Sequence, residues 1–207
     1  MATHDYGNGV ARTPDPVLKR KLLDRVVRYL ADNGVGHLSL RPMALKLEMS
    51  PHRLMHHFGP KDEMVATALQ RATEIQEEVQ ATWFADNPDL RQPELFRRWW
   101  EWITGDPANL ALVRLGLEAA TLDATITSLP MEVRAEQIGV WRTEIEGRFI
   151  AAGVPPRVAA IEASIAKATF TGLMVDLMAS GEIERLTESL HIYLDMLEKR
   201  VNDLAKG

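Results

Sequence analysis

The segment spanning residues 38–63, LSLRPMALKLEMSPHRLMHHFGPKDE, holds two helix start signals in close succession and restricts the fold more than any other part of the chain. Ser39 is a good N-cap, and Pro42 lies in the first helical turn, where its missing N–H costs little. Ser50 and Pro51 repeat the signal, with a capping hydroxyl followed by proline at the first helical position. The sequence therefore predicts two short helices joined by a tight turn.

The second of these helices is expected to have one apolar face and one face of basic and imidazole side chains. Leu54 and Phe58 are four residues apart and point inward, while the small Ala44 allows the two helices to cross closely. The side chains left to solvent or to a ligand are His52, Arg53, His56 and His57. A helix-turn-helix inserts its second helix into the major groove of DNA. We therefore predict that this helix reads base edges.

Charge is segregated along the chain in a way that suits contact with a polyanion. Residues 1–60 contain nine Lys and Arg against five Asp and Glu, and residues 61–207 contain fifteen against twenty-four, so net charges of +4 and −9 sum to −5. A basic head orients on DNA while an acidic body is repelled from it. An accidental excess of positive charge is the alternative, and the helix-turn-helix spacing in the same segment weakens it.

Composition restricts the remaining classes of function. The 46% hydrophobic content of 207 residues is ample for a core, and the absence of cysteine excludes disulfides and thiolate sites. No apolar run approaches the ~18 residues of a membrane span, and the N-terminus lacks the apolar core of a signal peptide, so we expect a cytoplasmic protein without membrane contact. No GxSxG, GxGxxG, HExxH or phosphate-loop motif occurs, so we expect no enzyme, no catalytic residues, no metal and no cofactor.

Helix-length pieces make up the rest of the chain. Apolar residues recur at helical spacing from Asp15 to Asn33, where Gly34 ends the run, and a longer helix is expected from about Lys61 to Trp83. Proline and glycine divide the remainder, and no strand-like alternation occurs. We therefore predict an all-α fold of about nine helices. Its parts are a flexible tail (1–14), a three-helix helix-turn-helix domain (15–60) and a helical bundle for effector binding and dimerisation (61–207).

Aromatic and methionine side chains of the body are numerous enough to line an apolar cavity. In residues 93–103, PELFRRWWEWI, Leu95 and Trp99 share one helical stripe and Phe96 and Trp100 share the next. Core packing is the alternative for any single aromatic residue. The predicted ligand contacts are Trp83, Phe96, Trp99, Trp100, Arg114, Glu118, Trp141, Phe170 and Met174.

The last two predicted helices differ from the others in side-chain size and in apolar spacing. Residues 158–179 are rich in small side chains, which allow another helix to approach closely. From Ile183 to Leu204, apolar residues recur at intervals of three and four residues and form one stripe. Such a stripe needs a partner helix, either on the chain's own body or about a two-fold axis in a dimer. In a homodimer, the predicted interface residues are Ala163, Thr169, Leu186, Leu190, Tyr193 and Leu197.

Residues 17–70 resemble the TetR family of bacterial transcriptional regulators. The similar segments are SLRPMA, SPHRL and MHHFGPKDEM, which includes a His-Phe pair and the start of a fourth helix. Beyond residue 80 only helical architecture and length agree. The resemblance implies phosphate contacts from Ser39, His57 and Lys61 and exposed reading positions on the second short helix. The predicted DNA-binding residues are Ser39, Ser50, His52, Arg53, His56, His57 and Lys61.

Two residues depart from the family pattern. Glu48 occupies the turn position usually held by glycine. Glycine is favoured where the backbone is left-handed, so a glutamate there is unusual if the turn needs that conformation. Met55 replaces the usual tyrosine before the His-Phe pair and removes a phenolic donor to phosphate. Specific binding would then rest more on Arg53, His57 and Lys61.

The leading interpretation is a homodimeric, ligand-responsive transcriptional repressor. It would bind a palindromic operator in double-stranded DNA and release it when a small apolar or amphipathic effector enters the body. A metal-dependent enzyme or sensor using His52, His56 and His57 is the alternative, since His52 and His56 lie one helical turn apart. A helical dimer that acts only through protein contacts is a third possibility.

Overall fold

The computed structural model describes residues 16–36, 38–121 and 130–206, and all regular secondary structure in these ranges is α-helical. The helices are α1 (Pro16–Asn33), α2 (Leu40–Lys46), α3 (Pro51–Phe58), α4 (Lys61–Asp86), α5 (Gln92–Gly105), α6 (Pro107–Thr121), α7 (Met131–Ala151), α8 (Pro156–Ser180) and α9 (Ile183–Leu204). The prediction of an all-α fold with about nine helices is confirmed. The tail predicted at residues 1–14 lies outside the described residues.

Local signals account for the ends of several helices. The first helix ends at Asn33 because Gly34 adopts a φ of 77°, and the Gly34 N–H bonds the carbonyl of Leu30 at 2.7 Å. The long fourth helix runs three residues beyond its predicted end at Trp83, as far as Asp86. It stops there because Asn87 precedes a proline, which disfavours the helical region for the residue before it.

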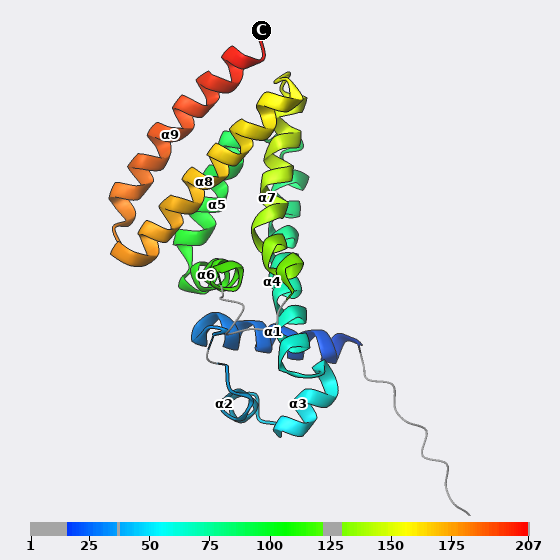
Figure 1. The fold of residues 1–207 in the computed structure, drawn as a ribbon. Coiled ribbons are helices and arrows are strands. Elements are labelled where there is room, and N and C mark those ends of the chain that lie inside the picture. Colours follow the sequence, from blue (N-terminus) through cyan, green and yellow to red (C-terminus); the bar gives the residue numbers. More distant parts are fainter. Residues whose placement is uncertain (1–15, 37, 122–129, 207) are drawn as a thin grey trace, which may run out of the picture.

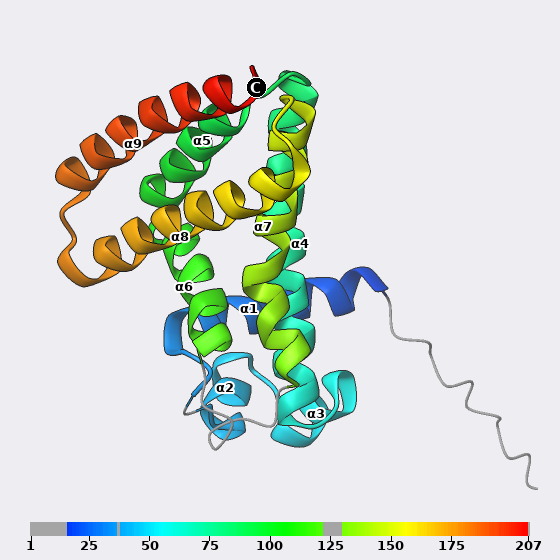
Figure 2. The same cartoon turned by 45° about the horizontal axis from the view of Figure 1, so that its top comes forward.

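The helices form a small head and a larger body. Helices α1, α2 and α3 lie together at one end, and α4 rises from them along the body beside α7 (Figure 1). The turned view of Figure 2 shows the same arrangement, with α8 and α9 on the side of the body away from α4. One long helix therefore connects the head to the upper part of the body.

Two hydrophobic clusters hold the head and the body. The head cluster joins buried residues of α1, α2 and α3 to the first part of α4, such as Met64 and Leu69, and to Leu112 and Leu115 of α6. The body cluster joins α5, α7, α8 and α9 around Phe96, among others. Packing of the head thus extends past residue 60 into α4 and α6.

A buried arginine ties α4 to α1. The Arg71 residue is 6% exposed, and its guanidinium donates to Asp24 Oδ1 at 2.7 Å and to Glu78 Oε1 at 2.8 Å. Burial alone would lower the pKa of Arg71, but the hydrogen bonds to Glu78 and Asp24 outweigh it and raise that pKa above its ordinary value. The charged guanidinium therefore links α4 to α1 through its ion pair with Asp24.

Helix α8 is by length and composition alone apolar enough to cross a membrane, with a mean hydropathy of 1.4 over eighteen residues. In this chain α8 packs along α7 and α9, and one face of it, including Ala163 and Phe170, lies in the body core. Its other face carries the exposed residues Ile161, Ile165 and Val175.

Candidate nucleic-acid interface and effector pocket

Helix α3 has the two faces that its sequence predicts. Ser50 caps it, since the Ser50 hydroxyl accepts a hydrogen bond from the Arg53 N–H at 3.2 Å. Leu54 and Phe58 are buried against the head cluster, while the residues that point outward are His52, Arg53 and His56. The helix lies at the end of the head farthest from α9 (Figure 1). Its exposed face is therefore open to a large partner such as duplex DNA.

His57 is partly buried, whereas the other two histidines of α3, His52 and His56, are exposed. Burial lowers the pKa of His57, and the positive charges of Arg53, His56 and Lys19 lower it further. The ring of His57 packs edge-on against that of His56, with centroids 5.9 Å apart. His57 is therefore favoured as a neutral ring until an anion approaches it.

The two remaining predicted phosphate contacts lie at helix starts. Ser39 is the exposed N-cap residue of α2, but its side chain makes no capping hydrogen bond, so the hydroxyl is free to bond elsewhere. Lys61 is the first residue of α4 and is half-buried. Ser39 thus precedes the first helix of the helix-turn-helix, and Lys61 follows its second helix, α3, by three residues.

The turn between α2 and α3 requires a left-handed residue. Glu48 has a φ of 59°, a positive value that no other non-glycine residue in the described ranges shares. Only glycine adopts this conformation without a steric penalty, which for other residues is about 1–2 kcal/mol. Glu48, which replaces the glycine usual at this turn position, therefore has a strained backbone.

The histidine group of α3 does not form a metal site in the part of the chain that the structure describes. No set of three or more His, Asp or Glu side chains within residues 16–36, 38–121 and 130–206 is arranged to hold a metal ion. The metal-dependent alternative therefore gains no support from the geometry.

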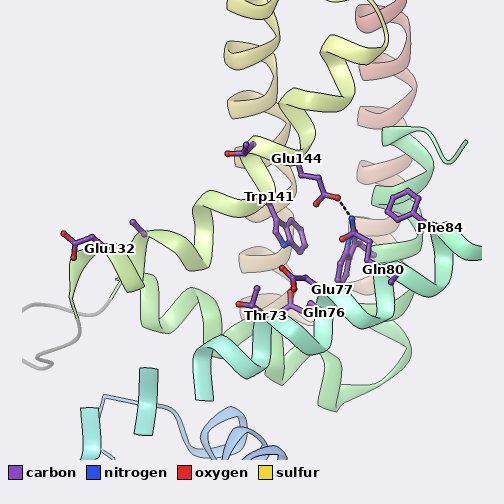
Figure 3. Close-up of a pocket in the computed structure, with 12 residues that line it drawn as sticks. Thr73, Gln76, Glu77, Gln80, Phe84, Glu132, Trp141 and Glu144 are labelled. Atoms are coloured by element: carbon purple, nitrogen blue, oxygen red, sulfur yellow. Dashed lines mark hydrogen bonds between the residues drawn. The ribbon is translucent and has the colours of Figure 1, made fainter. Parts of the chain in front are cut away.

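The body contains a pocket of about 980 Å³ between α4 and α7. Its lining residues are Thr73, Gln76, Glu77, Gln80, Ala81, Phe84, Trp99, Glu132, Ala135, Trp141, Thr143 and Glu144. Figure 3 shows the side chains of Glu77 and Trp141 facing each other across it from α4 and α7. The Gln80 amide donates to the Glu144 carboxylate, which joins the two walls at one end.

Of the predicted ligand contacts, Trp99 and Trp141 line this pocket. Their ring centroids are 5.0 Å apart, and Trp83 packs edge-on against Trp99 at the same distance. The remaining aromatic and methionine residues of the set, Phe96, Trp100, Phe170 and Met174, are buried behind this wall in the body cluster. They support the pocket wall and do not reach its surface.

Arg114 and Glu118 lie elsewhere, on the face of α6 that meets the head. The Arg114 guanidinium donates to the carbonyl of Ala31 at 2.6 Å. The Glu118 carboxylate accepts the N–H groups of Val35 and Gly36 at 2.9 and 3.1 Å. These two side chains join α6 to the end of α1 instead of lining the pocket.

Within the predicted dimerisation set, most side chains point into the chain's own core. Ala163, Leu186, Leu190 and Leu197 are buried in the body cluster, and Thr169 and Tyr193 are half-buried. The reason is that the apolar stripe of α9 packs on α5 and α8 of the same chain. The large apolar residues left exposed on these two helices are Ile161, Ile165, Val175, Ile183, Ile192 and Met196.

Sequence reasoning missed the pocket wall contributed by α4. Thr73, Gln76, Glu77, Gln80 and Phe84 follow one another at helical spacing, so they share one face. That spacing was the available signal, but polar residues on one face of a helix ordinarily indicate solvent.

Solved structures with the same architecture are found among bacterial regulators. A transcriptional regulator from Rhodococcus sp. Rha1 is 25% identical, with a TM-score of 0.68 over 89% of this chain and 97% of its own. A regulator assigned to the TetR family, from Rhodococcus sp., is 16% identical, with a TM-score of 0.65 over 86% and 97%. The multidrug binding protein EbrR in complex with imidazole is 23% identical, with a TM-score of 0.60 over 91% and 96%.

No protein-family model and no curated protein sequence matches the chain. The likeness is therefore one of structure: a helix-turn-helix head, a long fourth helix and a helical body that extend over nearly the whole of each chain compared. The chain has the fold of the TetR family of transcriptional regulators.

Proposed function

We propose that this chain is a cytoplasmic, ligand-responsive transcriptional repressor that binds a palindromic operator as a homodimer. The observation that carries the proposal is the exposed face of α3, which bears His52, Arg53 and His56. Helix α3 lies at the end of the basic head (Figure 1). Phosphate contacts from Ser39, Ser50, His57 and Lys61 would position this helix, and Arg53 would pair with a guanine edge. The functional division of the chain is then a DNA-binding unit at 15–60 and an effector and dimerisation unit at 61–207.

The exposed apolar face of α8 and α9 supports the homodimer. Ile161, Ile165 and Val175 on α8 and Ile192 and Met196 on α9 are about half exposed or more, although each is a large apolar side chain. Such a patch marks an interaction surface, and a second copy offers an identical patch about a two-fold axis. Pairing of the two copies holds two heads at the spacing that a palindrome requires.

The pocket between α4 and α7 supports response to a small molecule. EbrR, which shares the fold, is described as a multidrug binding protein and has been crystallised with imidazole, malachite green and proflavin. Helix α4 contributes one wall of the pocket and also packs in the head cluster. An effector that favours one tilt of α4 would change the spacing of the heads, and a coupling of about 1–3 kcal/mol relaxes binding 5- to 150-fold.

Selection of duplexes from a random pool by the purified protein tests this proposal. We expect enrichment of a palindrome whose half-sites are about one or two helical turns apart. In gel shifts on that site, Arg53→Ala should weaken binding and relax the preferred base, whereas Lys61→Ala should lower affinity on all sequences and reduce the salt slope by about one. Recovery of no palindromic site would reject the proposal.

A further inference from the structure

The charge and ring content of the pocket between α4 and α7 indicate which molecules it accepts. Its lining includes three carboxylates, Glu77, Glu132 and Glu144, and its described lining residues include no lysine or arginine. Two large indole rings, those of Trp99 and Trp141, form part of the same wall. Acidic and aromatic groups together form the usual environment of an organic cation.

Two of the three carboxylates have no partner among the described residues. Glu144 accepts a hydrogen bond from Gln80 and lies 3.6 Å from the Arg148 guanidinium, so its charge is largely compensated. Glu77 and Glu132 form no ion pair or hydrogen bond with the described part of the chain. Their negative charges are therefore free to act on a molecule in the pocket.

The chain itself places a cation in the same kind of setting at one end of this pocket. The Arg148 guanidinium carbon lies 4.4 Å from the ring centroid of Phe84, a pocket residue, and beside Glu144. A cation on an aromatic face next to a carboxylate is therefore already stable in this part of the body. The Trp141 ring and the Glu77 carboxylate, which face each other in Figure 3, repeat the combination of an aromatic ring and a carboxylate.

We propose that the effector of this protein is an amphipathic organic cation, held by Glu77 and by the indole rings of Trp99 and Trp141. The inference rests on the proposed function, because it assigns the chemical class of the ligand for that regulator's pocket. The rings bind the apolar part of the cation and Glu77 compensates its charge, while Glu132 raises the negative potential from the start of α7. An anion of the same shape is repelled by both carboxylates.

A pair of probes with nearly the same shape and opposite charge isolates the preference of the pocket for a cation. Tetraphenylphosphonium and tetraphenylborate are titrated into the full chain by calorimetry at constant ionic strength. We expect the cation to bind at least about tenfold more tightly than the anion, since a cation on an indole face beside a carboxylate gains on the order of 1–2 kcal/mol. Equal binding of the two probes, or no binding of the cation, overturns the inference.

Matched variants locate the charge that matters. Glu77→Gln keeps the side-chain shape and should weaken tetraphenylphosphonium about fivefold to tenfold without weakening tetraphenylborate. Glu101→Gln removes an exposed carboxylate outside the pocket lining and should change neither affinity. An equal response of the two variants rejects the role of Glu77. Duplex selection is scored separately, so a regulator that selects DNA but does not discriminate the probes loses this inference alone.

Discussion

The Glu118 carboxylate on α6 accepts a hydrogen bond from the backbone N–H of Val35 at 2.9 Å, which joins the body to the loop after α1. The same oxygen accepts the Gly36 N–H at 3.1 Å. Val35 and Glu118 are more than eighty positions apart in the sequence, and their hydrogen bond is partly buried. Glu118 therefore links α6 directly to the segment that leads into α2.

Replacement of Glu118 by alanine should destabilise the chain and weaken this connection. Two partly buried N–H groups lose their acceptor, which costs about 1–3 kcal/mol of the free energy of unfolding. Urea unfolding followed by circular dichroism measures the loss, and Glu118→Gln should lose less because the amide oxygen still accepts. Glu101→Ala, an exposed position on α5, is the control and should leave the midpoint unchanged.

Replacement of Glu48 by glycine should stabilise the helix-turn-helix. Glycine adopts the observed φ of 59° without strain, so we expect a gain of about 0.5–1 kcal/mol after the added entropy of the unfolded chain is subtracted. Glu48→Ala removes the same charge and keeps the strain. A thermal melt in which alanine stabilises as much as glycine would show that the charge, and not the backbone, limits stability.

Binding of DNA should take up a proton at His57. Burial and nearby cations hold the pKa of His57 below its usual value, so the ring is neutral at pH 7.5, and a phosphate placed beside it restores the charged form. Affinity should therefore rise as the pH falls from 7.5 to 6, by up to about tenfold for one proton. Fluorescence anisotropy with an operator duplex measures this slope. It should shrink in His57→Gln and persist in His191→Gln, whose ring lies on α9.

The same pKa shift has a consequence for stability in the absence of DNA. The folded-state pKa of His57 lies below that of the unfolded chain, so the unfolded state binds more protons as the pH drops through about 6.5. The contribution of neutral His57 to stability is complete above that pH and is lost below it. Unfolding midpoints that fall equally with pH in wild type and His57→Gln would contradict this assignment.

A charge placed on the exposed face of α8 should separate the two copies. Ile165→Glu puts a carboxylate in a patch that we expect to be buried between two apolar surfaces, so sedimentation should detect monomers at micromolar concentration. Ile150→Glu alters an exposed apolar residue on α7 and should leave the assembly intact. Monomers in the unaltered protein would remove the basis of the proposed operator symmetry.

Local signals allowed much of this fold to be predicted from the sequence. The Ser50-Pro51 start of α3, the Gly34 stop of α1 and the apolar spacing along α9 are each encoded within one or two helical turns. The sequence predicted less well which helix faces pack against one another. Helix α8 carries apolar residues on several faces, so periodicity could not tell whether Ala163 or Ile165 would meet the chain's own body.

In the candidate site, too, locally encoded features could be predicted and tertiary contacts could not. The exposure of His52 and Arg53 follows from the inward positions of Leu54 and Phe58 on one short helix. In contrast, Glu118 bonds backbone groups of a distant loop, which no side-chain pattern reveals. The pocket face of α4 carries polar residues such as Gln76 and Gln80, which have the same spacing whether they border water or a ligand.

Arg71 is held by Asp24 of α1 as well as by Glu78 of its own helix, so α1 must follow when α4 pivots. The 26 residues of α4 extend over about 39 Å at 1.5 Å per residue, and they act as a lever arm whose two ends lie in different clusters. A rotation of about 5° about one end would displace the other by about 3 Å over this length. A ligand that shifts the upper part of α4 by a small angle would thus move α3 by a distance comparable to a hydrogen bond, enough to break its register on DNA.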